Sequence, residues 1–540
     1  MPSQRASKPS ASKKAAPRVR GTTAVPERVA GGRIEAAPPG FLLVNVIPKS
    51  LSGETSQDSE PHLAANPANA AQIAATAFSP NPGGGSLGPV YISTDAGNTW
   101  RVNAIVPSVP GSVTGTHDIT TSFNAKGTKL YAGILSTRRG AMQFLRTDNP
   151  FGSTPMVILK SRPDADQPFT HATTVPSGAD AGKDRVYIGN NDFAAPGDRT
   201  ETVDLSLDGA VTSPAFTTVR IEKRGVAVGQ DGPQSRPVAH RDGTAYAAFY
   251  RWRGLSGTFE TNTLVITAAD VVVVRDDKGG AADFASLVEP PAPAGDGRIG
   301  KRAAQGVSFP FMNRGTPATG QQRIGGTISI AVDPKNSSIV YLAWGDAQPG
   351  TFLTIHVRRS VDRGLTWSPQ DLLTIPNATN AALAIAEIVP VIGATKTGRT
   401  ARRTAETSQT SAVPPVVPSK IVIGLLYQQV TGTGAAQRWV THLRRSPDGV
   451  NWSDLILADA PATAPAKDFD PYLGDYDHLV AVQNVFCGIF SANNTPDLAN
   501  FPNGVKYQRN ANFATRTLLN VDNQTPVAIS IDPFFFRVVN

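Results

Sequence analysis

The residues best suited to chemistry are acidic, tyrosine and arginine side chains that gather just before strand-like segments. Asp470, Tyr472, Asp475 and Tyr476 fall within one stretch of seven residues, and paired carboxylates can exchange protons with a bound substrate. We therefore take these four as candidate catalytic residues. Polar side chains before other predicted strands are candidate ligand-binding residues: Asp58, Glu60, His117, Asp118, Asp166 and Arg236.

The same side chains admit two other interpretations. A ring of carboxylate oxygens could hold a hard cation such as calcium, although the sequence requires no cofactor. Polar residues before a strand also cap turns and bind channel water, which is the structural alternative to ligand binding for any one of them. Whether these residues bind a ligand, hold a cation or only cap turns depends on whether the fold brings the clusters together.

The elements that would position these residues are short β-strands. The chain has 49 Gly, 44 Pro and 17% charged residues, which suits an all-β protein with many turns. Each of a series of paired β-rich segments is followed by two further strands. This pattern predicts a β-propeller of four-stranded antiparallel blades, with seven blades favoured and six as the alternative. The paired segments lie at about 62–78, 117–135, 170–190, 236–250, 328–345, 385–428 and 469–491.

An eight-residue pattern separates some of these strands. Residues 93–100 and 360–367 both read Ser-x-Asp-x-Gly-x-Thr-Trp, and Pro67 and Pro334 each stand 28 positions before the Asp of their copy. The Asp can accept hydrogen bonds from the amides that follow it, the Gly permits a positive φ, and the Trp begins the next strand. Shortened copies occur at 146–148, 206–209, 275–279 and 446–452. The pattern therefore marks hairpin turns of an internal repeat.

This pattern is the Asp-box, or bacterial neuraminidase repeat, and the chain resembles the sialidase-like β-propellers. The resemblance implies a propeller over 41–540 that is closed into a ring by strands near 41–46 and 527–531. It also implies that the boxes lie on the face opposite the ligand-binding mouth of the central channel. The polar residues singled out above would then surround that mouth.

Sialidases of this kind hold the sugar carboxylate with three arginines, one of them in a Phe/Tyr-Arg-Ile-Pro motif, and use a Tyr nucleophile with a Glu and an Asp acid/base. The motif is missing here. The guanidinium group bonds both oxygens of a carboxylate at once, so arginines elsewhere could replace it. The candidates are Arg236 and, in the 291–326 connection that should run over the channel face, Arg298, Arg302, Arg314 and Arg323.

Two functions remain open. The missing arginine motif favours a propeller that binds a glycan or protein ligand at its channel face without catalysis. The Asp and Tyr cluster at 470–476 favours an exo-sialidase-like glycoside hydrolase with arginines at non-standard positions.

The first 34 residues differ in kind from the rest. They carry eight Lys or Arg and one Glu, which gives plus seven of the total formal charge of plus eight. A segment this polar cannot fold alone, so we expect a disordered basic tail over 1–40. Such a tail is either a solvated leader or a contact for an acidic partner or for delivery machinery.

We expect a second flexible segment, an insertion at 394–418.

Targeting signals and cysteines give little information about the function of the chain. The tail lacks the apolar centre of a secretory signal, which fits cytoplasmic synthesis with a non-standard export route as an option. Without a run of 18 apolar residues, no membrane span is expected. Cys487 stands alone, so no disulfide forms within the chain.

Overall fold

The computed structural model describes the chain in segments. These are residues 33–82, 84–107, 115–137, 141–194, 200–225, 235–258, 261, 263–311, 326–347, 352–388, 420–462 and 477–540. The predicted flexible insertion at 394–418 and most of the predicted basic tail, residues 1–32, lie outside these segments. Within them, no helix is long and apolar enough to cross a membrane.

The described strands form consecutive four-stranded antiparallel units, as the all-β prediction requires. Unit 1 holds β3 (Ser59–Ala65), β4 (Ile73–Pro80), β5 (Leu87–Ser93) and β6 (Arg101–Pro107), with the short β7 (Gly115–Thr116) beside β4. Unit 2 holds β8 (Ile119–Phe123), β9 (Leu130–Thr137), β10 (Ala141–Thr147) and β11 (Val157–Arg162). Unit 3 holds β12 (Ala165–Thr174), β13 (Asp184–Asp192), β14 (Thr200–Ser206) and β15 (Thr217–Arg220). Unit 4 holds β16 (Arg236–Ala239), β17 (Ala245–Ser256), β18 (Val265–Asp276) and β19 (Lys301–Pro310).

The next two units share a strand. Unit 5 holds β20 (Ile328–Asp333), β21 (Asn336–Asp346), β22 (Leu353–Ser360) and the start of β23 (Leu373–Ile388). Beyond Ala378, β23 leaves β22 and pairs with β24 (Lys420–Thr431), so it becomes the first strand of unit 6. Unit 6 continues with β25 (Arg438–Ser446) and β26 (Ser453–Pro461), and β1 (Arg33–Ile34) lies parallel to β26. The predicted tail therefore overlaps a described strand at its C-terminal end.

The last unit joins the two ends of the chain. Unit 7 holds β27 (His478–Val482), β28 (Val485–Asn493), β33 (Ile531–Val539) and, from the N-terminal end, β2 (Leu42–Asn45). The closing C-terminal strand expected at 527–531 lies instead at β33. Between β28 and β33 the chain makes an excursion with short elements: η3 (Leu498–Asn500), β29 (Lys506–Tyr507), β30 (Ala511–Asn512), β31 (Thr517–Leu519) and β32 (Pro526–Val527). The helical turns η1 (Lys49–Leu51) and η2 (Gly434–Ala436) complete the described elements.

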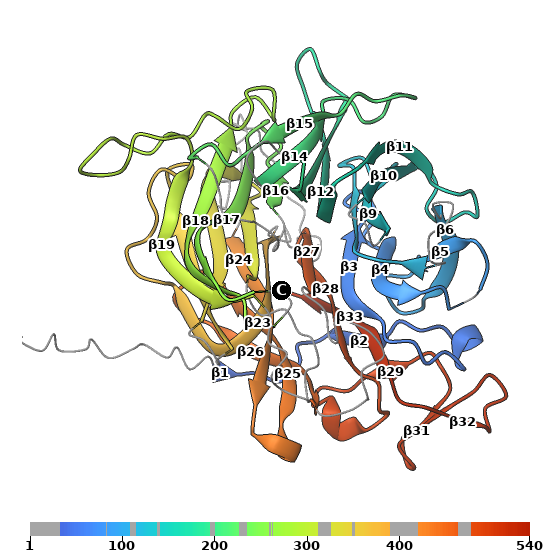
Figure 1. Ribbon diagram of the computed structural model, residues 1–540. Helices are drawn as coiled ribbons and strands as arrows, with labels where there is room; N and C mark the ends of the chain where they lie inside the picture. The colour runs from blue at the N-terminus through green and yellow to red at the C-terminus, as the bar shows by residue number, and fades with distance from the viewer. Residues whose placement is uncertain are drawn as a thin grey trace, which may run out of the picture.

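The innermost strands contact one another in a closed order, β3, β8, β12, β16, β20, β23, β27 and again β3. Figure 1 shows the units arranged around a common centre, from blue β3 through green β12 to red β27. Each of the seven predicted strand pairs overlaps the first two strands of one unit. The innermost strands therefore surround an axial channel. We call the end where they begin the mouth end and the opposite end the box end.

The first Asp-box is a hydrogen-bonded turn between β5 and β6. Asp95 Oδ1 accepts from Thr99 N at 2.8 Å, and Ser93 Oγ accepts from Gly97 N at 2.9 Å. Gly97 has φ +84°, a conformation that glycine adopts at little cost. Trp100 is buried and donates its indole N–H to the Gly97 carbonyl at 3.0 Å. The turn thus holds the Trp ring in the protein interior.

The other boxes occupy the same place in their units. The contacts recur between β22 and β23, where Thr366 N donates to Asp362 at 2.9 Å. They recur again between β25 and β26, where the backbone amides of Asn451 and Val450 lower the pKa of Asp448. The three remaining shortened copies follow β10, β14 and β18. All six therefore lie between the third and fourth strands of a unit, at the box end. Unit 7 has the end of β33 and the start of β2 at this place.

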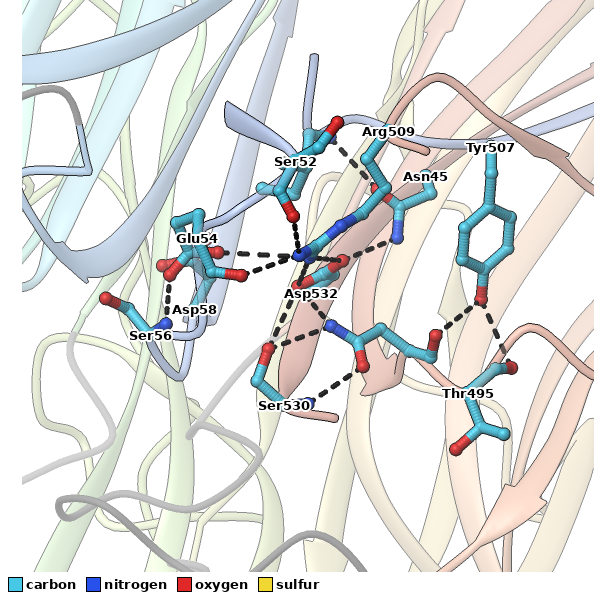
Figure 2. Close-up of polar contacts among 12 residues, drawn as sticks. Asn45, Ser52, Glu54, Ser56, Asp58, Thr495, Tyr507, Arg509, Ser530 and Asp532 are labelled. Atoms are coloured by element: carbon cyan, nitrogen blue, oxygen red, sulfur yellow. Dashed lines mark hydrogen bonds and ion pairs between the residues drawn. The ribbon is translucent and has the colours of Figure 1, made fainter. Parts of the chain in front are cut away.

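A buried polar network fastens the seam between units 1 and 7 (Figure 2). Arg509 Nη1 lies 2.9 Å from Asp532 Oδ2, and Arg509 Nη2 donates to the carbonyls of Ser52 at 2.9 Å and Glu54 at 2.6 Å. Asn45 Nδ2, on β2, donates to Asp532 at 2.7 Å. We call this the seam network; it consists of Asn45, Glu54, Asp58, Asn494, Arg509 and Asp532. It ties the segment before β3 to the excursion before β33.

Arg509→Met should destabilise the protein by about 3–5 kcal/mol, because it leaves the buried Asp532 without its cation. Urea unfolding monitored by tryptophan fluorescence measures this change. Arg516→Met is the matched control, since Arg516 is exposed and pairs with Asp497 at the surface; it should cost no more than about 1 kcal/mol. Equal effects of the two substitutions would show that the seam network does not hold the ring closed.

Candidate functional site

The axial channel contains a cavity of about 310 Å³. All seven innermost strands contribute to its lining, and many of the lining residues are small, including Ala64, Ala172, Ala331, Ala382 and Ala384. The lining reaches Arg236 and His478 towards the mouth end and the exposed Pro67 at the box end. The cavity therefore follows the channel from one group of polar side chains to the opposite face.

Four side chains from four innermost strands converge near the mouth end. The rings of His62 and His478 stack with centroids 3.6 Å apart, and Phe169 meets them edge-on at 5.4 Å and 5.8 Å. The guanidinium carbon of Arg236 lies 4.1 Å from the centroid of the Phe169 ring. We call His62, Phe169, Arg236 and His478 the channel cap.

A repeated backbone device places two members of the cap. In β3 the register shifts by one residue between Ser59 and His62, and in β12 it shifts in the same way between Asp166 and Phe169. Each shift contains a residue with positive φ, Glu60 at 51° and Gln167 at 57°, followed by a proline. Such a bulge re-aims the side chains that follow it. His62 and Phe169 thus occupy equivalent positions in units 1 and 3.

The imidazoles of the cap are held in their neutral form. Thr121 N donates to His62 Nδ1 at 3.1 Å, so the proton of the neutral ring is on Nε2. Burial, then the neighbouring His478 and Arg236, lower the pKa of His62 well below its usual range. Burial and Arg236 lower the pKa of His478 to about 3, and burial lowers that of His171, further along the channel, to about 4.

Asp477 is the one carboxylic acid in the cavity lining of the described chain. Burial raises its pKa well above the usual range and outweighs a backbone hydrogen bond from Ser491. Burial in the channel therefore favours the neutral form of this acid. It could donate a proton or a hydrogen bond within the channel.

Among the predicted ligand-binding residues that the structure describes, Arg236 alone lines the cavity. Asp58 lies in the seam network, where Tyr91 donates to its Oδ2 at 3.2 Å. Glu60 is buried at the bulge of β3. The bulge and the seam therefore turn both of these acids away from the cavity.

The remaining predicted residues lie beside the cap or outside the described chain. His117 stacks on Phe78 with centroids 5.2 Å apart. Gln167 Nε2 donates to Asp118 at 3.3 Å, and Asp166 accepts from the Gln167 amide at 2.7 Å. The residues outside the described segments are Asp470, Tyr472, Asp475, Tyr476, Arg314 and Arg323.

Two of the arginines expected over the channel face, Arg298 and Arg302, belong to the described segments, and both lie at the outer edge of unit 4. Arg302 belongs to β19, the outermost strand of unit 4, and pairs with Glu289 at 2.9 Å. Arg298 donates to the Arg224 carbonyl beside the same strand. Part of the 291–326 connection is thus a fourth strand and not a loop over the channel, because β18 needs a partner on its outer edge.

Sequence reasoning missed His62 and Phe169. The available signal was the dipeptide Pro61-His62, which matches Pro168-Phe169 after an acidic or amide residue in both units. Among the described residues, no group of three or more His, Cys, Asp or Glu side chains is arranged to hold a metal ion. Asp470 and Asp475 lie outside that part of the chain, and calcium binding by them stays a prediction.

No protein-family model matches the chain, and the search of curated proteins found no match. Among solved structures the chain is similar to a mutant of NanB sialidase from Streptococcus pneumoniae, with 10% identity over 92% of this chain and 70% of that chain and a TM-score of 0.35. It is also similar to the GH93 α-L-arabinofuranosidase of Fusarium graminearum, with 10% identity, 77% and 92% covered and a TM-score of 0.34. A thermostable family-43 glycoside hydrolase gives 11% identity, 59% and 95% covered and a TM-score of 0.30. Similarity this low carries no argument about function, so the function has to be inferred from the chain's own residues.

The channel imidazoles predict a loss of stability in acid. Their folded pKa values lie below the unfolded value of about 6.5, so the unfolded chain binds more protons as the pH falls from 6.5 towards 3. His478→Gln should reduce the slope of unfolding free energy against pH by up to about 1.4 kcal/mol per pH unit in this range. Urea unfolding at pH 7.5, 6 and 5 measures the slope, with pH 7.5 as the reference. An unchanged slope would mean that His478 is protonated in the folded channel.

Proposed function

We propose that this chain is a seven-bladed Asp-box propeller that binds a glycan at its axial channel without hydrolysing it. The observation that carries the proposal is the convergence of the channel cap from β3, β12, β16 and β27. Phe169, Arg236 and His478 line the cavity, and His62 packs behind them against His478. Side chains from distant parts of a sequence that meet at a cavity form a concave site with few, positioned polar groups, as ligand sites do.

The chemistry of the described channel favours binding over hydrolysis. The usual glycosidase mechanism needs two carboxyl groups, about 5–5.5 Å or 6.5–9.5 Å apart. The described lining offers the single acid Asp477 and no tyrosine. The lining offers both hydrogen-bond donors and acceptors to a hydroxylated ligand. These are neutral imidazoles, a guanidinium and the hydroxyls of threonine and serine.

Exo-sialidase-like hydrolysis is the second candidate, and Asp477 is the observation that favours it. A buried carboxylic acid whose pKa is raised can act as a general acid. Asp470, Tyr472, Asp475 and Tyr476 stand directly before it in sequence and would supply the remaining groups. Arg323 would help to hold the substrate carboxylate. The carboxylates could in addition bind a calcium ion, which the reaction would not require.

The partner would be a glycan or a glycoprotein. The basic segment within residues 1–34 would add a weak, salt-sensitive contact with an acidic partner. Deletion of this segment should leave glycan binding unchanged if the channel alone recognises the ligand.

Phe169→Leu should weaken glycan binding at least tenfold, because it removes the ring against which Arg236 and both histidines pack. A glycan array followed by calorimetry on the best ligand measures this loss. Phe513→Leu, a half-buried phenylalanine next to Tyr507, is the matched control and should bind normally. The pure protein should not turn over a fluorogenic sialoside between pH 4 and 8. Turnover that Asp477→Asn abolishes would establish the hydrolase instead.

A further inference from the structure

The seam network contains more carboxyl groups than cations. Glu54, Asp58 and Asp532 share Arg509, and all four side chains are buried. The Nη1 of Arg509 bonds both oxygens of Asp532, at 3.2 Å and 2.9 Å, and its Nη2 bonds two backbone carbonyls. Glu54 Oε2 is 4.0 Å from Arg509 Nη1 and has no hydrogen-bond partner among the described residues. The one guanidinium is therefore committed to Asp532.

Three ionised carboxylates would leave two buried negative charges without a cation, which is too costly for a folded protein. The cluster must hold protons. The groups that face Glu54 are Asp532 on β33, Arg509 before β30 and Asp58 before β3, with Tyr91 on β5 and Tyr507 on β29 around them. Burial, then Asp532, raise the pKa of Glu54 to about 7, and burial, then Glu54, raise that of Asp58 well above its usual range.

The segment that carries Glu54 leads directly into the channel cap. Asp58 N donates to the Ile531 carbonyl at 2.9 Å, and Ser491 Oγ donates to the Asp58 carbonyl at 2.9 Å. The bulge at Glu60 follows, and then His62, which stacks on His478 across the seam. A displacement of residues 52–58 would therefore reach the cap residue His62 through the four residues 59–62.

We propose that the seam network is a pH-dependent latch on residues 46–58, closed when Glu54 is protonated and loosened when Glu54 is ionised, and that it regulates ligand binding at the channel cap. The regulatory part rests on the glycan-binding function proposed above. The latch itself does not, since it follows from the charges at the seam. An ionised Glu54 would face Asp532 with Ser56 as its hydrogen-bond donor and with Arg509 4.0 Å away and already bonded to Asp532, so the segment would leave the seam to hydrate the charge.

Hydrogen–deuterium exchange of the full chain at pH 6, 7 and 8, corrected for the intrinsic pH dependence of exchange, tests the latch. Amides in residues 46–58 should exchange at least tenfold faster at pH 8 than at pH 6, whereas amides of β17 and β18 should not change. Glu54→Gln should keep the segment protected at pH 8, because a neutral side chain of the same shape cannot ionise. Glu387→Gln, which removes a carboxyl that pairs with Lys335 at the box end, is the matched control and should open like the natural chain.

Equal protection at pH 6 and pH 8, or opening of Glu54→Gln like that of the natural chain, would overturn the latch. This experiment needs no ligand, so its outcome is independent of glycan binding. If the array yields a ligand, its affinity should fall at least tenfold from pH 6 to pH 8 in the natural chain and stay constant in Glu54→Gln. A constant affinity in both, with the segment opening as expected, would overturn the regulation alone.

Discussion

Closure of the ring at one seam is the constraint on which the rest of the structure depends. The last unit is assembled from both ends of the chain, because β2 and β33 pair as its two outer strands. His62 lies in the first unit and His478 in the last, so their rings meet only when the seam is closed. The channel cap is therefore a product of closure and not of any single unit. Arg509 and Asp532, which hold the seam, are as important for the site as the residues that line it.

Closure also explains why several titratable groups are buried in their neutral forms. The histidines of the channel lose stability as the pH falls below 6.5, because the unfolded chain binds the additional protons. The stability contributed by Glu54 changes with pH in the opposite direction. Its pKa is raised in the folded protein, so the unfolded chain releases this proton first and stability falls as the pH rises from about 4.5 to about 7. Between these values the two contributions oppose each other. The ring is thus suited to a mildly acidic to neutral range and is weakened on both sides of it.

The sequence predicted what depends on local contacts. The Asp-box turns were predictable because Asp95 and Thr99 bond within five residues, and the strand pairs because their turns are short. A second local repeat was missed: His356 and His442 each stand four residues before a box Ser, and each bonds an Asp. Asp371, just before the fourth strand of unit 5, lies 2.7 Å from His356, and Asp454, in the fourth strand of unit 6, lies 3.0 Å from His442. The channel cap was harder to predict from the sequence, because it depends on ring closure and on one-residue bulges. No hydrophobic pattern reveals such bulges.

The fate of the acidic residues before the innermost strands bears on the choice between binding and hydrolysis. They were expected to form a ring around the channel mouth. In the described part of the chain Asp58 joins the seam network, while Asp118 and Asp166 bond to Gln167 at the bulge of β12. These acids stabilise the backbone that carries the cap, and their places in the cavity lining are taken by aromatic, imidazole and guanidinium groups. Within the described lining, a channel built in this way has hydrogen-bonding groups for a ligand but a single carboxyl group, that of Asp477. Hydrolysis would therefore depend on residues 463–476, whereas binding needs only what the seven innermost strands already bring together.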